Sequence, residues 1–144
     1  MRILDLFCGL GNFSVAMAAG GACVKGVEVG ESAVARATNN AVLNGLNNCA
    51  FYQAGLSGDF GHKDWAKATY DALLLDPPRA GAQEAVTVLK NKLPPRILYV
   101  SCNRATLARD AGLLKAEGFR LSRLGVMDMF PQTTHIESMA LFER

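Results

Sequence analysis

Two residues in the last third of the sequence have the types and settings that covalent catalysis requires. Cys102 ends the apolar stretch 96–101 and precedes a stretch, 105–117, of helical character. A thiol at the start of a helix is well placed to act as a nucleophile, because the positive end of the helix stabilises a thiolate. Glu137 is the best candidate for a separate general base, and His135 competes with it. From spacing alone, an ordinary surface carboxylate is the more common explanation for Glu137.

The first thirty residues carry a pattern that is typical of nucleotide binding. Asp5 stands four positions before Gly9, and Gly9 and Gly11 permit a tight turn that a ligand can approach closely. Glu28 lies 23 positions after Asp5 at the end of the next apolar stretch, where a carboxylate can accept hydrogen bonds from both ribose hydroxyls. Ser14 replaces the third glycine of the dinucleotide-binding pattern. The arrangement therefore resembles that of S-adenosylmethionine-dependent methyltransferases.

A proline-rich segment, Asp76-Pro77-Pro78-Arg79, follows the apolar stretch 71–75. The prolines fix the backbone angle φ and remove backbone donors, so the segment forms a rigid platform at the end of a strand. Such a platform can hold a planar base beside a cofactor. A strand exit that merely happens to be rich in proline is equally compatible with this motif alone.

Residues so far apart in the sequence need a framework that brings them together, and the apolar pattern predicts one. Strands are predicted at 2–7, 22–29, 49–54, 71–75, 96–101, 119–127 and 138–142, helices at 12–19, 31–43, 83–93 and 105–117, and loops at 55–64 and 128–135. This alternation predicts an α/β fold, a mostly parallel seven-stranded sheet with helices on both faces. The first, fourth and fifth strands are neighbours in a doubly wound sheet. Gly9, Asp76 and Cys102 are therefore expected to converge on one cleft.

Length and composition restrict the class of protein. The chain has 144 residues, of which 50% are hydrophobic and 19% charged, so we expect one domain spanning 1–144. The longest apolar runs, such as 72–75, are far shorter than the ~20 residues that cross a bilayer. No signal pattern opens the chain, and we expect a cytoplasmic protein without membrane association. A net charge of +2 neither requires nor excludes a basic patch for RNA.

The four cysteines are widely spaced and include no C-x-x-C pair, so a metal site is not expected. Cys8, Cys23 and Cys49 stand in apolar, strand-like settings, where buried free thiols are common. Cys102, at the end of a predicted strand, differs from them.

Read together, four motifs resemble the RNA uracil-C5 methyltransferases. They occur in the order Asp5–Phe13, Asp76–Arg79, Ser101-Cys102-Asn103 and Asp128-Met129-Phe130-Pro131 with His135-Ile136-Glu137. The resemblance covers almost the whole chain, and the stretches 51–53, 64–67 and 105–110 look most like the 23S ribosomal RNA branch. It implies a Rossmann-like fold, S-adenosyl-L-methionine as the cofactor and RNA as the partner. A uridine of 23S ribosomal RNA is the first expectation and a tRNA uridine the alternative. We expect a monomer.

The resemblance also implies a role for each candidate residue. Cys102 would add to carbon 6 of uracil, which makes carbon 5 nucleophilic, and Glu137 would later remove the carbon-5 proton. The positions expected to contact the cofactor are Phe7, Gly9, Asn12, Glu28 and Asp76. Asp76 and Arg79 are expected beside the target base. Gly55 falls where relatives often have a polar side chain that touches the adenine.

Members of the family also carry an upstream RNA-binding barrel, a central segment that holds an iron–sulfur cluster in the 23S enzymes, and a glutamine that touches the cofactor. None of these lies in this sequence, which opens directly with its first predicted strand, and we therefore expect a carboxy-terminal catalytic piece. Three alternatives stay open. An amino-group methyltransferase also uses a D-P-P motif but needs no thiol, and the cytosine-C5 RNA enzymes also use a cysteine. A cofactor-binding fragment that is inactive without upstream domains would not need the pair Cys102 and Glu137.

Overall fold

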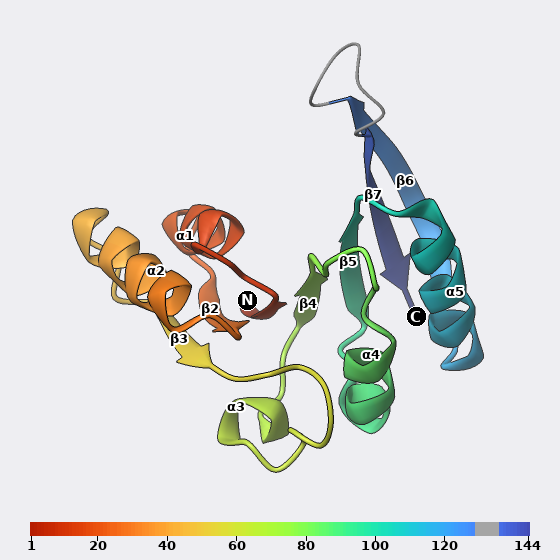
Figure 1. The fold of residues 1–144 in the computed structure, drawn as a ribbon, viewed down its shortest axis with the longest axis horizontal. Helices are drawn as coiled ribbons and strands as arrows, with labels where there is room; N and C mark the ends of the chain where they lie inside the picture. The colour runs from red at the N-terminus through yellow and green to blue at the C-terminus, as the bar shows by residue number, and fades with distance from the viewer. Residues whose placement is uncertain (129–135) are drawn as a thin grey trace.

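The computed structural model describes residues 1–128 and 136–144. Its strands form one seven-stranded sheet in the order β3-β2-β1-β4-β5-β7-β6 (Figure 1). The strands are β1 (Arg2–Leu6), β2 (Cys23–Glu28), β3 (Cys49–Gln53), β4 (Ala72–Leu75), β5 (Arg96–Ser101), β6 (Arg120–Asp128) and β7 (Ile136–Glu143). The helices are α1 (Asn12–Ala19), α2 (Glu31–Leu43), α3 (Asp64–Lys67), α4 (Gln83–Leu89) and α5 (Arg104–Ala116), with a 3-10 turn, η1 (Lys90–Lys92), after α4.

The strand order explains where a ligand should bind. The first five strands pair in parallel, whereas β7 pairs antiparallel with both β5 and β6. The chain first moves outward from β1 to β3 and then returns to β4, so the order reverses between β1 and β4. Ligands of open α/β sheets bind beyond the carboxyl ends of the strands at such a reversal. The predicted fold class is confirmed, and so is the adjacency of the first, fourth and fifth strands.

Helices cover both faces of the sheet, as the alternation predicted. On one face, Leu73, Ile97 and Tyr99 belong to the large core that includes buried residues of α3, α4 and α5. On the other face, Ile3 and Val24 pack with Ala18 of α1 in a smaller cluster. Figure 1 shows α1 and α2 over the half of the sheet that contains β1–β3, and α4 and α5 over the half that contains β5–β7.

Some predicted boundaries were wrong. The helix expected at 83–93 ends at Leu89, and the chain tightens into η1 before the two prolines that follow Leu93. The segment expected as a loop at 55–64 contains a buried aromatic, Phe60, whose ring stacks on Trp65 of α3 with ring centroids 5.5 Å apart. A four-residue helix is too short to produce a hydrophobic period, so α3 left no signal in the sequence pattern.

The expectation that three of the cysteines occupy buried settings was also wrong. Cys23 is exposed, and Cys8 and Cys49 are only half-buried. Cys23 and Cys49 are the first residues of β2 and β3, and Cys8 lies in the turn after β1, so none of the three lies in a strand interior. Within residues 1–128 and 136–144, no helix is both long and apolar enough to cross a membrane.

Candidate active site

The turn between β1 and α1 has an unusual backbone that a ligand can approach. Phe7, Gly9 and Gly11 all have positive φ, at 64°, 54° and 80°. A non-glycine residue in this region is uncommon and is often found at functional sites. A Cβ atom on Gly11 would lie 3.0 Å from Ala37 Cβ and 3.1 Å from the Phe51 ring, so α2 and β3 pack closely against this turn.

Asp5, near the carboxyl end of β1, is 1% exposed, and a hydrogen bond connects its side chain with the first turn of α1. Its Oδ2 accepts a hydrogen bond of 2.5 Å from Ser14 Oγ, whereas its buried Oδ1 has no partner within the described residues. Burial raises the pKa of Asp5 to about 7, the Ser14 hydrogen bond opposes that rise, and the neighbouring charge of Asp76 adds to it. The serine in place of a third glycine is thus an internal partner of the strand-end carboxylate.

A cavity of about 710 Å³ opens at this edge of the sheet. Of the predicted cofactor residues, Phe7, Glu28 and Asp76 line it, whereas Gly9 and Asn12 are not among its lining residues. The other lining residues are Val29, Gly55–Ser57, Pro78, Ala80–Ala85 and Arg109. A Cβ atom on Gly55 would meet nothing within 4 Å, so this wall has room for a side chain.

Glu28 is half-buried at the end of β2, and its backbone continues into a sharp turn toward α2. Its Oε2 accepts a hydrogen bond of 2.8 Å from the Gly30 backbone N–H, which fixes the carboxylate at the cavity wall. A carboxylate held through one oxygen can present its remaining lone pairs to hydroxyl groups in the cavity.

Asp76 comes directly after β4, between the ends of β1 and β5. Burial raises its pKa to about 6, and the charge of Glu137 contributes to the rise. Asp76 therefore connects the cavity, which it lines, with the candidate general base Glu137, whose charge affects its pKa. Arg79, three residues later, is exposed and is not among the lining residues.

The ladder between β5 and β7 brings Cys102 and Glu137 together. Ser101 pairs with Ser138 in antiparallel register, so the next residues toward the edge of the sheet are Cys102 and Glu137. Cys102 is exposed and directly precedes Asn103, whose Oδ1 caps α5 by accepting a hydrogen bond of 3.0 Å from the Ala105 N–H. An exposed thiol at the edge of the sheet is accessible to a substrate, unlike a core cysteine.

Glu137 was expected in a segment ahead of the last strand, and that placement was wrong. It lies within β7, which begins at Ile136, and pairs with Met127 of β6. Pairing with β6 extends the strand beyond its apolar run, so the backbone of the candidate base is held on one side by a neighbouring strand. His135, the competing base, lies outside the described residues.

The structure thus brings Asp76, Cys102 and Glu137 to the ends of three adjacent strands. Asp76 lines the cavity together with Phe7 and Glu28, whereas Cys102 and Glu137, like Gly9, are not among its lining residues. No group of three or more His, Cys, Asp or Glu side chains in the part of the chain described here could hold a metal ion. The arrangement offers a thiol, a nearby carboxylate and an acid-lined cavity for a second molecule.

Comparison with known proteins identifies the family of this chain. The family model described as tRNA (Uracil-5-)-methyltransferase matches residues 1–144. The chain belongs to this uracil-5-methyltransferase family. A curated relative from Photobacterium angustum, named 23S rRNA (uracil(1939)-C(5))-methyltransferase RlmD, is 54% identical over 141 residues, which are 98% of this chain and 64% of the relative. The protein of that name from Pseudomonas aeruginosa is 55% identical over 99% of this chain.

The family members are longer than this chain, which spans 32% of the Pseudomonas aeruginosa relative. Among solved structures, Pyrococcus abyssi tRNA (uracil-54, C5)-methyltransferase in complex with S-adenosyl-L-homocysteine matches with a TM-score of 0.84 and 34% identity, over 97% of this chain and 33% of that one. The magnesium protoporphyrin IX methyltransferase of Synechocystis, with bound SAM, has a TM-score of 0.74 at 21% identity over 99% of this chain and 69% of that one. The second likeness is one of fold alone.

Sequence reasoning missed one wall of the cavity. Ala80–Ala85 and Arg109 line it, although no residue among them was predicted to contact the cofactor. A signal was present in the helix after Cys102, because Asn103, Thr106 and Arg109 recur at intervals of three and therefore lie along one side of α5.

Proposed function

We propose that this chain is the catalytic domain of an S-adenosylmethionine-dependent RNA methyltransferase that acts on carbon 5 of a uridine. The observation that supports the proposal is the register of β5 and β7, which puts the backbone positions of Cys102 and Glu137 beside each other at the strand ends. Asp76 lines the cavity and is close enough to Glu137 for its pKa to be raised by that charge. Uracil-C5 methylation needs both a nucleophile and a separate base, whereas methylation of an amino group needs neither a thiol nor a carbanion.

The cavity suits a cationic nucleoside ligand. Glu28 and Asp76 line it. In addition, the buried Oδ1 of Asp5 has no hydrogen-bond partner among the described residues. Carboxylates favour a ligand that carries an ammonium group, a sulfonium and ribose hydroxyls, and S-adenosyl-L-methionine has all three. When bound, this molecule supplies an electrophilic methyl group. Glu28 would hold the ribose, and Phe7 would form part of the wall around the ligand.

The residues of the chain account for the remaining chemistry. The Cys102 thiolate would attack carbon 6 of the uracil, forming a C–S bond and moving an electron pair toward carbon 5 as an enolate. Carbon 5 is then nucleophilic enough to be methylated. Glu137 would take the carbon-5 proton, after which the C–S bond breaks and the thiolate is regenerated. The Asp76 carboxyl, whose pKa burial raises to about 6, would form a hydrogen bond with the uracil ring, and the exposed Arg79 can meet an RNA phosphate.

The curated relatives that share 53–55% identity support 23S ribosomal RNA as the substrate, and the tRNA enzyme at 34% identity supports the alternative. We therefore propose a uridine of 23S ribosomal RNA, reached in the cytoplasm by a monomeric enzyme. Mass analysis of 23S ribosomal RNA and tRNA, each incubated with the full-length protein and labelled cofactor, separates the two. A label on tRNA alone would reject the ribosomal substrate.

The mechanism is tested with Cys102→Ser in the full-length protein. We expect methylation to disappear and cofactor binding to survive, because a serine hydroxyl is a far weaker acid than a thiol. Cys23→Ser is the matched control, since Cys23 is also exposed but begins β2 and so lies at the amino-terminal ends of the parallel strands, away from the site at their carboxyl ends. RNA that contains 5-fluorouracil should trap the wild-type enzyme covalently at Cys102. A methylating serine variant, or an adduct on another residue, would overturn this mechanism.

A further inference from the structure

The segment that connects β4 to α4 is held against α5 by hydrogen bonds from side chains of α5 to its backbone. The Arg79 carbonyl accepts a bond of 3.1 Å from Asn103 Nδ2 and lies 3.1 Å from Thr106 Oγ1, a hydroxyl that is also 3.2 Å from the Asn103 carbonyl. The Ala80 carbonyl accepts a bond of 2.8 Å from Arg109 Nη2. Successive carbonyls of the segment therefore meet successive turns of one helix.

The far end of this contact is anchored by a buried carboxylate. Asp110 is 0% exposed, and its Oδ2 accepts hydrogen bonds of 2.7 Å from the Ala82 N–H and 2.6 Å from the Tyr99 hydroxyl. Arg109 pairs with the carboxylate of the next residue, since its Nε lies 3.0 Å and its Nη2 2.9 Å from Asp110 Oδ1. Neighbouring helix residues do not ordinarily face each other, and a buried carboxylate is costly unless it is paired in this way.

Gly81 shows how closely the segment approaches α5. Its φ is +81°, and a Cβ atom there would lie 2.6 Å from Arg109 Nη2 and 2.7 Å from Asp110 Oδ2. A side chain at this position would push the segment away from the helix. The contact therefore depends on a glycine as well as on the donors of α5.

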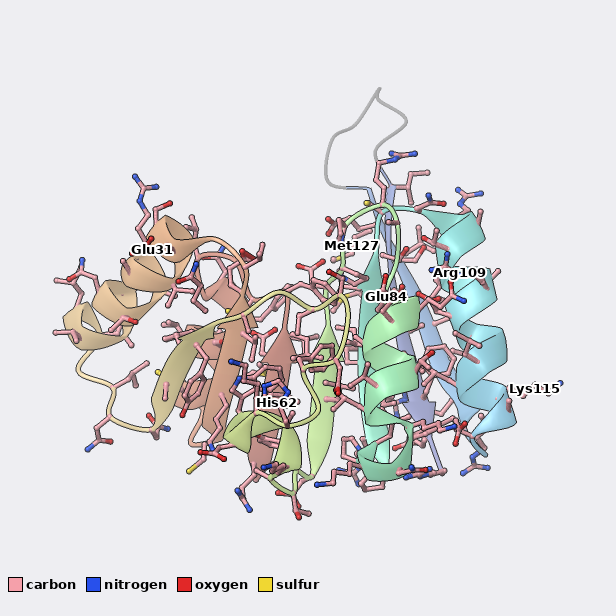
Figure 2. All side chains as sticks on the ribbon, turned by 60° about the horizontal axis from the view of Figure 1, so that its bottom comes forward. Glu31, His62, Glu84, Arg109, Lys115 and Met127 are labelled. Carbon is pink, nitrogen blue, oxygen red and sulfur yellow. The ribbon has the colours of Figure 1, made fainter. Side chains whose placement is uncertain are left out.

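One side of this contact lines the proposed cofactor cavity, and the other carries the residue that follows the proposed nucleophile. Ala80, Gly81 and Ala82 form one wall of the cavity, whereas Asn103 follows Cys102 and caps the helix behind it. Figure 2 shows Arg109 on the side of α5 that faces the first turn of α4, which carries Glu84, while Lys115 on the same helix points away. The nucleophile and the cofactor wall are thus joined through a few side chains.

We propose that Asn103, Thr106 and Arg109 are positioning residues, which fix the distance between Cys102 and the cofactor by holding the segment Arg79–Ala82 against α5. This proposal rests on the proposed function. Methyl transfer requires the reacting atoms to be aligned within a fraction of an ångström, and a displacement of about 1 Å can slow a reaction roughly 100-fold. The cofactor binds on one side of this contact, and the thiol adds to the uracil on the other. Loosening the contact should therefore change these two steps less than it changes the rate of methyl transfer.

The test uses the full-length protein with Thr106→Val, which keeps the side-chain shape but removes the hydroxyl, and a double variant that adds Arg109→Lys. Thr106→Ser restores the hydroxyl and should restore the rate. Thr38→Val is the matched control, because the Thr38 hydroxyl donates to the Val34 carbonyl of its own helix, at 2.9 Å, and to no other group among the described residues. Melting temperatures establish that each variant is folded. If the double variant does not fold, Thr106→Val alone is used for the measurements.

Three quantities are measured: the single-turnover rate of methyl transfer, the Kd of the cofactor, and exchange of the uracil carbon-5 hydrogen with deuterated water, which needs Cys102 but no methyl transfer. We expect the double variant to lose roughly tenfold or more in methyl transfer. The cofactor Kd of Thr106→Val and the exchange rate of both variants should stay within about threefold, since neither depends on alignment across the contact. Because Arg109 also lines the cavity, the methyl-transfer rate of the double variant is measured at saturating cofactor.

A proportional loss in exchange, a rate restored by saturating cofactor, or a serine variant as slow as the valine variant would each overturn the positioning role. The wild-type enzyme separates this inference from the function on which it rests. If wild type does not methylate uridine, the proposed function fails. If wild type methylates and the double variant matches it, only the positioning role fails.

Discussion

Replacing Asp5 by asparagine should make the protein less sensitive to pH. Asp5 is 1% exposed, and its pKa is about 7 in the folded chain because of burial, opposed by its hydrogen bond from Ser14 and reinforced by Asp76. An unfolded aspartate has a pKa of ~3.9. Between these values the folded protein binds more protons than the unfolded chain, so the free energy of unfolding falls as pH rises from about 4 to 7.

The pKa of Asp5 is higher by about three in the folded protein than in the unfolded chain, which corresponds to roughly 4 kcal/mol of stability at 1.36 kcal/mol per pKa unit. Of this stabilisation, about 2.5 kcal/mol is lost between pH 5 and pH 8. Asp5→Asn keeps the shape of the side chain and carries no charge. The free energy of unfolding of the variant should therefore rise by about 2.5 kcal/mol relative to that of wild type as the pH increases from 5 to 8. Asp76 titrates in both proteins, so its contribution largely cancels in the difference.

Urea unfolding of wild type and Asp5→Asn, followed by circular dichroism at intervals from pH 5 to pH 8, measures this difference. Asp64→Asn, at an exposed position in the first turn of α3, is the matched control and should leave the pH slope unchanged. A difference between Asp5→Asn and wild type that stays constant over the range would refute the reasoning. So would a variant that loses stability relative to wild type as the pH rises.

The remaining predictions concern the cofactor, the base and two glycines. Glu28→Ala should weaken cofactor affinity by about tenfold or more in calorimetry, because two ribose hydrogen bonds are lost, and unchanged affinity would remove Glu28 from the site. Glu137→Gln in the full-length protein should accumulate a covalent RNA adduct that already carries the methyl group, and normal turnover would contradict its role as base. Gly11→Ala should cost roughly 2–4 kcal/mol of stability, because φ is 80° and Ala37 and Phe51 leave no room, whereas Gly55→Ala should be neutral or stabilise by about 0.4–1 kcal/mol. Chemical unfolding of both variants decides this, and equal effects would contradict it.

The sequence contains enough to predict the order of the elements but not their ends. Apolar strands and amphipathic helices repeat with different periods, so the seven strands and four of the five helices could be located. Their boundaries depend on tertiary contacts that the pattern does not encode. The last strand starts at Ile136 rather than at position 138 because β6 pairs with it there, and α3 exists because Phe60 and Trp65 stack in the core.

The same distinction applies to the site. The positions of Asp5, Glu28, Asp76 and Cys102 near the ends of strands could be predicted, because each stands where an apolar stretch stops. The topology of the sheet then brings these strand ends together. The wall formed by Ala80–Ala85 could not be predicted, because its side chains are small or exposed and it is placed by backbone hydrogen bonds to α5.

That difference bears on how the reaction would be controlled. Strand ends place the reacting groups to within the spacing of neighbouring strands, which is about 4.8 Å and therefore too coarse for methyl transfer. The finer adjustment has to come from contacts made after the sheet is assembled. In this chain those contacts are the bonds from Asn103, Thr106 and Arg109 to the segment Arg79–Ala82. A substitution that keeps every strand-end residue can therefore still stop catalysis, and α5 is where such substitutions should be sought.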